Sequence, residues 1–255
     1  MNNIIAKKFK FDIGALIKGS GVLFIGMSIV NVGNYLFNLV LGRTLGPSDY
    51  GVFVALNSLL AFTSVVSSTF LTTAMKFASE FKAKNELAKI GTLVRYLNSK
   101  GFLIGIAFTI LMLILARPIS NFLNIDSSVP AMVLALYFLV IFTLSANRGI
   151  LQGLQRFTAL SINMALEPVG KILLAIALIW LGLKVSGAFG AIIMAATIMY
   201  FISFIPLKKL MTKTKEKIDL KMLWQYSGST LLVFIFLSVL SFLDVFLVKH
   251  YFDPH

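Results

Sequence analysis

The chain has 255 residues, of which 58% are hydrophobic and 13% charged, and it carries a net charge of +13. Soluble domains carry about 25% charged residues, so this chain has too few polar side chains to cover a water-facing surface. It contains no cysteine, which excludes disulfide frameworks and thiolate metal sites. Its two histidines, His250 and His255, lie at the end of the sequence, so no catalytic residue, metal or cofactor is predicted.

The first 18 residues mix apolar and basic side chains and are predicted to lie on the cytoplasmic side at the membrane interface. The apolar run from Val22 to Leu41 follows. This run is too long for the hydrophobic core of a secretory signal. It is therefore predicted to be the first membrane helix.

Seven segments are long and apolar enough to cross a bilayer, which takes about 20 mostly apolar residues. They are residues 19–42, 50–75, 101–123, 129–153, 158–182, 187–207 and 228–250. Between the first two, Gly46-Pro47-Ser48-Asp49 predicts that one helix stops and the next begins, and Gly182 predicts the end of the fifth. The expected fold class is an all-α, polytopic membrane bundle of about seven helices.

The connectors between these segments are alternately rich and poor in Lys and Arg. With the N-terminus inside, eighteen basic residues fall on the inner side and four on the outer side. The inner ones are Lys7, Lys8, Lys10, Lys18, Lys76, Lys82, Lys84, Lys89, Arg95, Lys100, Arg148, Arg156, Lys208, Lys209, Lys213, Lys215, Lys217 and Lys221, and the outer ones are Arg43, Arg117, Lys184 and Lys249. This bias predicts a multi-pass protein of the cell membrane with a cytoplasmic N-terminus. Short clusters in loops do not make a basic face, so nucleic acid is not an expected partner.

The chain is expected to divide into four parts. Residues 19–207 would form a six-helix bundle after the N-terminal segment, and residues 208–227 a basic cytoplasmic linker. Residues 228–255 would be the first helix of a second bundle. Ser20-Gly21 with Pro47, and Ser227-Gly228 with Pro254, bracket the first and seventh predicted helices at the same spacing. Many transporters consist of such paired halves. The chain is therefore predicted to be the first half of a pseudo-symmetric two-bundle transporter, truncated one helix into the second half.

Charged residues within the predicted spans are candidate functional residues, because a charge at the helix centre costs at least about 2.5–3.5 kcal/mol. Glu167 and Lys171 are four residues apart and share a helix face. They either line a water-filled cavity or form a self-satisfied packing pair. For Asp244 three roles stay open: pairing with Lys171 or Arg148 on another helix, titration as a proton-coupled group, or an interhelical hydrogen bond without a role in transport.

Arg148 and Gln152 lie one turn apart at the cytoplasmic end of the fourth predicted span. They are candidates for holding a phosphate or sugar, since the guanidinium fork matches phosphate oxygens. Arg148 also fits the simpler role of a positive-inside anchor.

The first predicted span carries a polar stripe of Asn31, Asn34 and Asn38, and Arg43 ends it. Such stripes either join helices or line a hydrated path. Two pairs of glycines at a spacing of four, Gly101 with Gly105 and Gly149 with Gly153, predict close helix packing.

Three motifs resemble polysaccharide-biosynthesis flippases of the multidrug/oligosaccharidyl-lipid/polysaccharide exporter superfamily. They are LGRTLGPSDYGVFVAL at 41–56, NRGILQGLQRF at 147–157 and SFLDVFLVKHYF at 241–252. The resemblance implies two pseudo-symmetric bundles that export lipid-linked oligosaccharides by alternating access. It also implies cavity-lining cations, for which Arg148 and Lys171 are the best matches, while Arg43 and Asp244 lie within the matching motifs.

The partners implied by the resemblance are a pyrophosphate-linked oligosaccharide lipid, membrane lipids and polysaccharide-assembly proteins. No nucleotide-binding loop is present, so an ion gradient or the membrane potential is the expected energy source. Two alternatives stay open. One is a drug or cation antiporter that uses Glu167 and Asp244, and the other is a membrane assembly subunit without transport activity.

Overall fold

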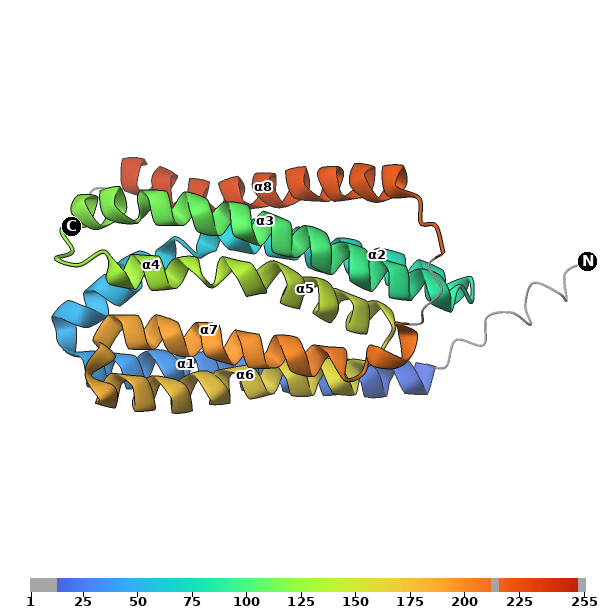
Figure 1. The fold of residues 1–255 in the computed structure, drawn as a ribbon, viewed down its shortest axis with the longest axis horizontal. Coiled ribbons are helices and arrows are strands. Elements are labelled where there is room, and N and C mark those ends of the chain that lie inside the picture. Colours follow the sequence, from blue (N-terminus) through green and yellow to red (C-terminus); the bar gives the residue numbers. More distant parts are fainter. Residues whose placement is uncertain (1–12, 212–215, 252–255) are drawn as a thin grey trace, which may run out of the picture.

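The computed structural model describes the backbone of residues 13–211 and 216–251, and side chains over 19–211 and 216–241. Within these ranges the regular structure is helical. The elements are α1 (Ile13–Ser58), α2 (Ala61–Ala83), α3 (Leu87–Phe122), α4 (Val129–Ala135), α5 (Phe138–Gly153), α6 (Phe157–Leu178), the π-helical turn η2 (Ile179–Leu183), α7 (Lys184–Phe204), the 3₁₀ turn η3 (Lys208–Leu210) and α8 (Leu220–Tyr251). The helices lie side by side along the long axis of the molecule (Figure 1).

Each of the seven predicted spans has a helical counterpart. In chain order they are α1 up to Leu45, the rest of α1 together with α2, α3, α4 with α5, α6, α7 and α8. The predicted fold class, an all-helical polytopic bundle, is therefore confirmed. Helix boundaries differ at two basic segments. α3 begins at Leu87 rather than near residue 101, and α8 begins at Leu220, inside the segment 208–227 that was expected to be a linker.

The early start of α3 has a packing reason. Gly91 on the extended start of α3 lies directly against the backbone carbonyl of Leu210, and a side chain at residue 91 would collide with it. Hydropathy marks only the part of a helix that lies in hydrocarbon. The polar ends of α3 and α8 extend beyond the hydrocarbon region, so the lengths predicted from the apolar runs were too short.

The chain reverses at residues with left-handed backbone conformation. Gly46 has φ 76° and divides α1, and Gly182 has φ 84° and separates α6 from α7, as their sequence context predicted. Asn85 (φ 60°) and Gln155 (φ 58°) occupy the same region at the ends of α2 and α5. Glycine, and less readily asparagine, adopts positive φ at low cost, and all four positions lie where a helix ends or is divided.

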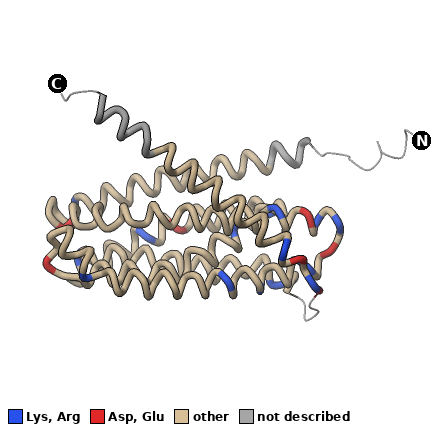
Figure 2. The backbone as a smooth tube through the Cα atoms, turned by 90° about the horizontal axis from the view of Figure 1, so that it is seen from above, with Lys and Arg blue, Asp and Glu red and all other residues tan. Residues whose placement is uncertain are grey.

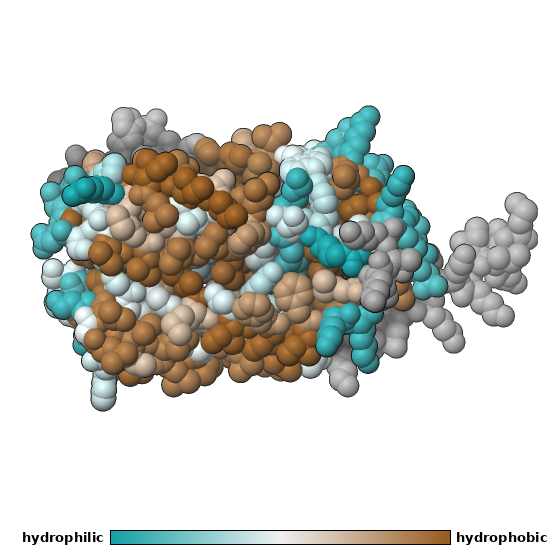
Figure 3. Space-filling model, viewed as in Figure 1, coloured by the Kyte–Doolittle hydropathy of each residue, from teal (hydrophilic) through white to brown (hydrophobic). Residues whose placement is uncertain are grey.

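The surface is that of a membrane protein. An apolar belt separates two hydrophilic ends (Figure 3), and most charged residues lie at those ends (Figure 2). Five described stretches are long and apolar enough to span a bilayer, and their bounds are Gly19–Ser58, Leu87–Phe122, Val129–Gly153, Phe157–Phe204 and Leu220–Ser241. The first and fourth of these contain the reversals at Gly46 and Gly182. The protein is therefore a multi-pass membrane protein.

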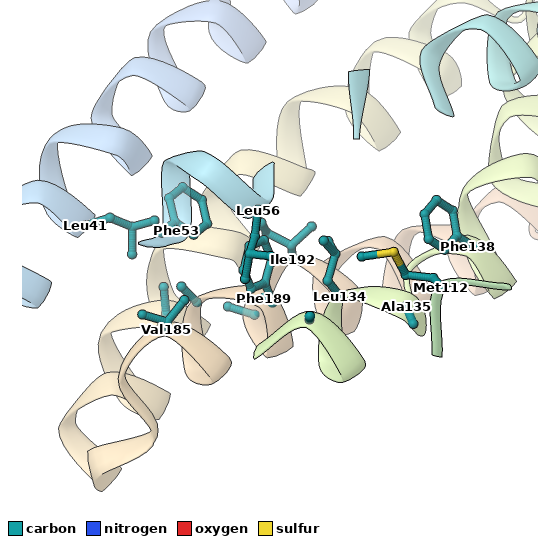
Figure 4. Close-up of a cluster of buried hydrophobic side chains, with 14 of the residues drawn as sticks. Leu41, Phe53, Leu56, Met112, Leu134, Ala135, Phe138, Val185, Phe189 and Ile192 are labelled. Carbon is teal, nitrogen blue, oxygen red and sulfur yellow. The ribbon is translucent and has the colours of Figure 1, made fainter. Parts of the chain in front are cut away.

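Side chains from α1, α4 and α7 form a buried core, to which α3 adds Met112 and α5 adds Phe138 (Figure 4). Phe53 and Phe189 are buried with their ring centres 5.0 Å apart. Leu41 and Leu56 are fully buried beside them. This core holds both halves of α1 against α7.

Glycines allow the helices in the middle of the bundle to approach closely. Gly149 and Gly153 of α5 lie against backbone carbonyls of α2, and Gly105 of α3 lies against the α5 backbone. A methyl group at Gly105 would lie 2.5 Å from the carbonyl oxygen of Phe138. The prediction that the paired glycines mark close packing is confirmed.

Polar contacts at the two ends join the connectors that were predicted to share a side. At one end, Lys82 Nζ donates to the Leu154 carbonyl and to Gln155 Oε1, both at 2.9 Å. Arg156 at the same end donates to the Pro206 carbonyl. At the other end, Lys184 Nζ lies 3.5 Å from Asp49 Oδ2. The basic connectors therefore gather at one end of the bundle, called the basic end below.

A candidate site of buried charges

Three charged side chains meet between α5 and α6. Arg148 Nη2 lies 2.7 Å from Glu167 Oε2, and Lys171 Nζ lies 3.8 Å from Glu167 Oε1. The exposed fractions of the Arg148, Glu167 and Lys171 side chains are 13%, 14% and 13%, so all three are largely removed from the surface. One carboxylate is thus shared by two cations, and the group, called the charge cluster below, carries a net charge of +1.

Asn163 positions the arginine of the charge cluster. Arg148 Nε donates to Asn163 Oδ1 at 2.8 Å, and Asn163 Nδ2 donates in turn to the Met199 carbonyl of α7 at 2.8 Å. Asn163, Glu167 and Lys171 follow one another at intervals of four residues, so they form a stripe on one face of α6. This stripe turns α6 toward Arg148 and ties both helices to α7.

Helix α1 completes the site at its lysine. Lys171 Nζ donates to Asn34 Oδ1 at 2.8 Å and lies 5.5 Å from the centre of the Phe37 ring. The helices come this close because Gly33 faces Pro168, where a Cβ on the glycine would lie 2.5 Å from the proline Cβ. The polar stripe of the first span therefore contributes one hydrogen-bond acceptor, Asn34, to the charge cluster.

A second, neutral network lies beside the charge cluster. Asn98 Nδ2 of α3 donates to Asn147 Oδ1 at 2.7 Å, and Asn147 Nδ2 donates to Ser203 Oγ of α7 at 2.8 Å. Asn147 and Arg148 are consecutive and reach different neighbours, so α5 connects both networks. Sequence reasoning missed Asn98, Asn163 and Ser203. The four-residue interval from Asn163 to Glu167 was the signal that would have found Asn163.

The other predicted site residues do not join the charge cluster. Gln152 is half-buried and makes no side-chain hydrogen bond within the described residues. Asn31 and Arg43 are exposed, and exposed Asn38 donates to the Asn34 carbonyl at 2.9 Å. Asp244 belongs to α8 but lies outside the residues whose side chains are described.

Not all hydrogen-bond donors of the charge cluster are used within it. Lys171 has three donors, and the contacts described for it are to Asn34, to Glu167 at 3.8 Å and to the Phe37 ring. Within the described residues no three His, Cys, Asp or Glu side chains come close enough to hold a metal ion. The charge cluster therefore combines two cations with one carboxylate.

Several solved structures share this fold, among them transporters of the multidrug/oligosaccharidyl-lipid/polysaccharide (MOP) superfamily. One, from Pyrococcus furiosus, is described as having a binding pocket of reversed polarity, and it aligns with a TM-score of 0.72 and 20% identity over 89% of this chain and 54% of its own. An outward-facing multidrug resistance transporter of the MATE family aligns with a TM-score of 0.69 and 19% identity over 88% of this chain and 54% of its own. A MATE protein in a straight conformation aligns with a TM-score of 0.73 and 18% identity over 89% of this chain and 54% of its own.

The chain therefore has the fold of one half of a MOP-superfamily transporter and spans about half the length of these relatives. Residues 16–254 match the polysaccharide biosynthesis proteins, and the chain belongs to that family. The suspected family is thereby confirmed. No curated protein matches the chain.

Proposed function

We propose that the protein moves lipid-linked oligosaccharide or polysaccharide precursors across the cytoplasmic membrane by alternating access. The observation that carries this proposal is the net positive charge of Arg148, Glu167 and Lys171 inside an apolar bundle. An uncompensated cation in hydrocarbon is costly, so it marks a site that an anion occupies for part of a transport cycle.

The charge cluster suits a pyrophosphate-linked head group. Arg148 offers a planar fork that matches phosphate oxygens, and Lys171 offers a mobile point charge one turn beyond Glu167. In this proposal Glu167 offsets one of the two positive charges while the site is empty, and both cations turn to the phosphate when substrate enters. The lipid tail stays in the bilayer, so the protein shields only the polar head.

Membership of the polysaccharide biosynthesis family supports a sugar-linked substrate over a free drug. The related Pyrococcus furiosus transporter, described as having a pocket of reversed polarity, suggests that pocket charge varies within this fold. In the proposed architecture, residues 19–207 are the first bundle and α8, which begins at Leu220, starts a second one. The basic connector lies between them, and the N-terminal segment 1–18 lies in the cytoplasm.

A cation or drug antiporter would need an acidic site. Glu167 is the acidic residue of the charge cluster, and Arg148 already holds it at 2.7 Å. A cation would have to displace the arginine, and Lys171 would still repel it. The charge balance therefore favours an anionic substrate.

The test is a flipping assay with the protein reconstituted in liposomes and a fluorescent, polyprenyl-pyrophosphate-linked sugar as substrate. Lys171→Met and Arg148→Met should each lower the flipping rate at least tenfold while the amount of inserted protein stays constant. Lys184→Met is the matched control, because it removes an exposed lysine at the end of the bundle opposite the basic end. This variant should transport the substrate at the normal rate. Full activity in both site variants would refute the proposal, and cation-coupled dye transport by the unmodified protein would favour an antiporter.

A further inference from the structure

A second site lies away from the charge cluster, in a cavity between α2, α3 and α8. Its volume is about 420 Å³, within the range of about 300–1,000 Å³ typical of ligand pockets. The lining is mostly aliphatic and aromatic, including Val66, Phe70, Ile104, Phe108 and Leu231. The cavity therefore suits an apolar ligand.

The cavity extends along α3 from near the basic end. Its α3 lining extends from Tyr96 to Phe108, which is about 18 Å at 1.5 Å per residue. One leaflet accounts for half of a hydrocarbon core about 30 Å thick. The cavity thus has the depth of about one leaflet.

The polar groups along the cavity are already paired, except at one lysine. Thr73 Oγ1 and Ser227 Oγ lie 3.1 Å apart, and Trp224 Nε1 donates to the Tyr96 hydroxyl at 2.7 Å. Lys100 lines the same cavity, half-buried, with its ammonium 5.9 Å from the centre of the Tyr96 ring. Within the described parts of the chain, Lys100 has neither a hydrogen bond nor an ion pair.

An unpaired cation at the polar mouth of an apolar, leaflet-deep cavity complements a lipid phosphate. The Lys and Arg residues of the basic end attract anionic head groups of the adjoining leaflet, and Tyr96 and Trp224 are the residue types that favour the membrane–water interface. We propose that this cavity binds one acyl chain of an anionic glycerophospholipid, with the head-group phosphate at Lys100. The lipid would join α8 to the first bundle.

Trp224 provides a direct reporter, because brominated acyl chains quench a tryptophan only on contact. Trp180, the other tryptophan, is replaced by Phe, and the protein is titrated with dibrominated phosphatidylglycerol or phosphatidylcholine in micelles. Half-maximal quenching should need at least a threefold lower mole fraction of phosphatidylglycerol. Equal quenching by the two lipids would overturn the proposal.

Two variants distinguish recognition of the lipid head group from binding of the acyl chain. Lys100→Gln should abolish the preference for phosphatidylglycerol, whereas Lys221→Gln, an exposed lysine at the start of α8, should retain it. Gly228→Leu should reduce quenching by both lipids, because a Cβ there meets nothing within 4 Å and the side chain would fill the cavity. An unchanged preference in Lys100→Gln, or unchanged quenching in Gly228→Leu with an unshifted Trp224 emission spectrum, would contradict the assignment.

Discussion

Two carboxylates in this protein sit between two cations in nearly the same local pattern, yet their surroundings differ. On α2, Glu80 lies 3.3 Å from Lys76 and 2.7 Å from Lys84, each four residues away. On α6, Glu167 lies 3.8 Å from Lys171, also four residues away, and 2.7 Å from Arg148 of α5. The first group is at the basic end, and the second is inside the apolar belt.

The comparison shows that helix spacing alone does not fix what an ion pair does. In water, an exposed pair gains little, because solvent screens it and each side chain loses freedom. The Lys84 ammonium holds the pKa of Glu80 below its ordinary value, and Glu80 raises the pKa of Lys84 in return. Inside the bundle, the partners of each charge compensate for its lost hydration. Removing one partner therefore leaves an uncompensated charge buried in a low-dielectric environment.

The largest effect is expected for Glu167→Gln. This change leaves Arg148 and Lys171 as two buried cations without a counter-ion, which should destabilise the fold by about 3–5 kcal/mol. Thermal unfolding in detergent measures the loss. Added farnesyl pyrophosphate should recover more stability in this variant than in the unmodified protein, because the pyrophosphate replaces the missing carboxylate. A variant as stable as the unmodified protein would show that the cluster is hydrated like Glu80.

The next effect concerns helix packing beside the charge cluster. Gly149→Ala places a methyl group against the Leu71 carbonyl and should cost about 1–3 kcal/mol through overpacking. Gly51→Ala is the matched control, because a Cβ there meets nothing within 4 Å. The control should be neutral or slightly stabilising, since alanine favours helix over glycine. Equal melting temperatures for the two variants would argue against close α2–α5 packing.

A smaller effect is expected at the basic end, where Lys82 joins α2 to the turn after α5. Lys82→Met removes donors to the Leu154 carbonyl and Gln155 Oε1 and should cost about 0.5–1.5 kcal/mol. Burial and the nearby Arg156 lower the pKa of Lys82, so part of the gain from these bonds is already offset. Hydrogen exchange of the 154–156 turn should accelerate in the variant. Unchanged exchange there would contradict the role given to Lys82.

The smallest effect is expected for Glu80→Gln, which should cost less than about 1 kcal/mol at neutral pH. Because the folded pKa of Glu80 lies below its ordinary value of 4.5, its contribution is present above pH 4.5 and is lost as the pH falls through the folded pKa. Stabilities of the variant and the unmodified protein should therefore converge in acid. A difference that persists or grows there would refute the ion-pair interpretation.

Much of the fold follows from the sequence, because apolar runs and turn residues are local signals. Gly46 and Gly182 were predicted to end helices, and both adopt the left-handed conformation. The site was only partly predictable. Glu167 and Lys171 were identified as a pair from their spacing, but the shorter contact of Glu167 is to Arg148 on another helix. No local pattern reports which helices become neighbours, which is also why Asn34 could not be singled out from Asn31 and Asn38.

The central claim is that the charge cluster presents net positive charge to an anionic head group within the membrane. Calorimetric titration with farnesyl pyrophosphate and with uncharged farnesol tests it most directly, in the unmodified protein and in Lys171→Met, which keeps the Arg148–Glu167 pair intact. The account predicts that the unmodified protein binds the pyrophosphate at least tenfold more tightly than the alcohol, and that Lys171→Met loses this preference while remaining folded. A folded Lys171→Met protein with an unchanged preference for the pyrophosphate would contradict it.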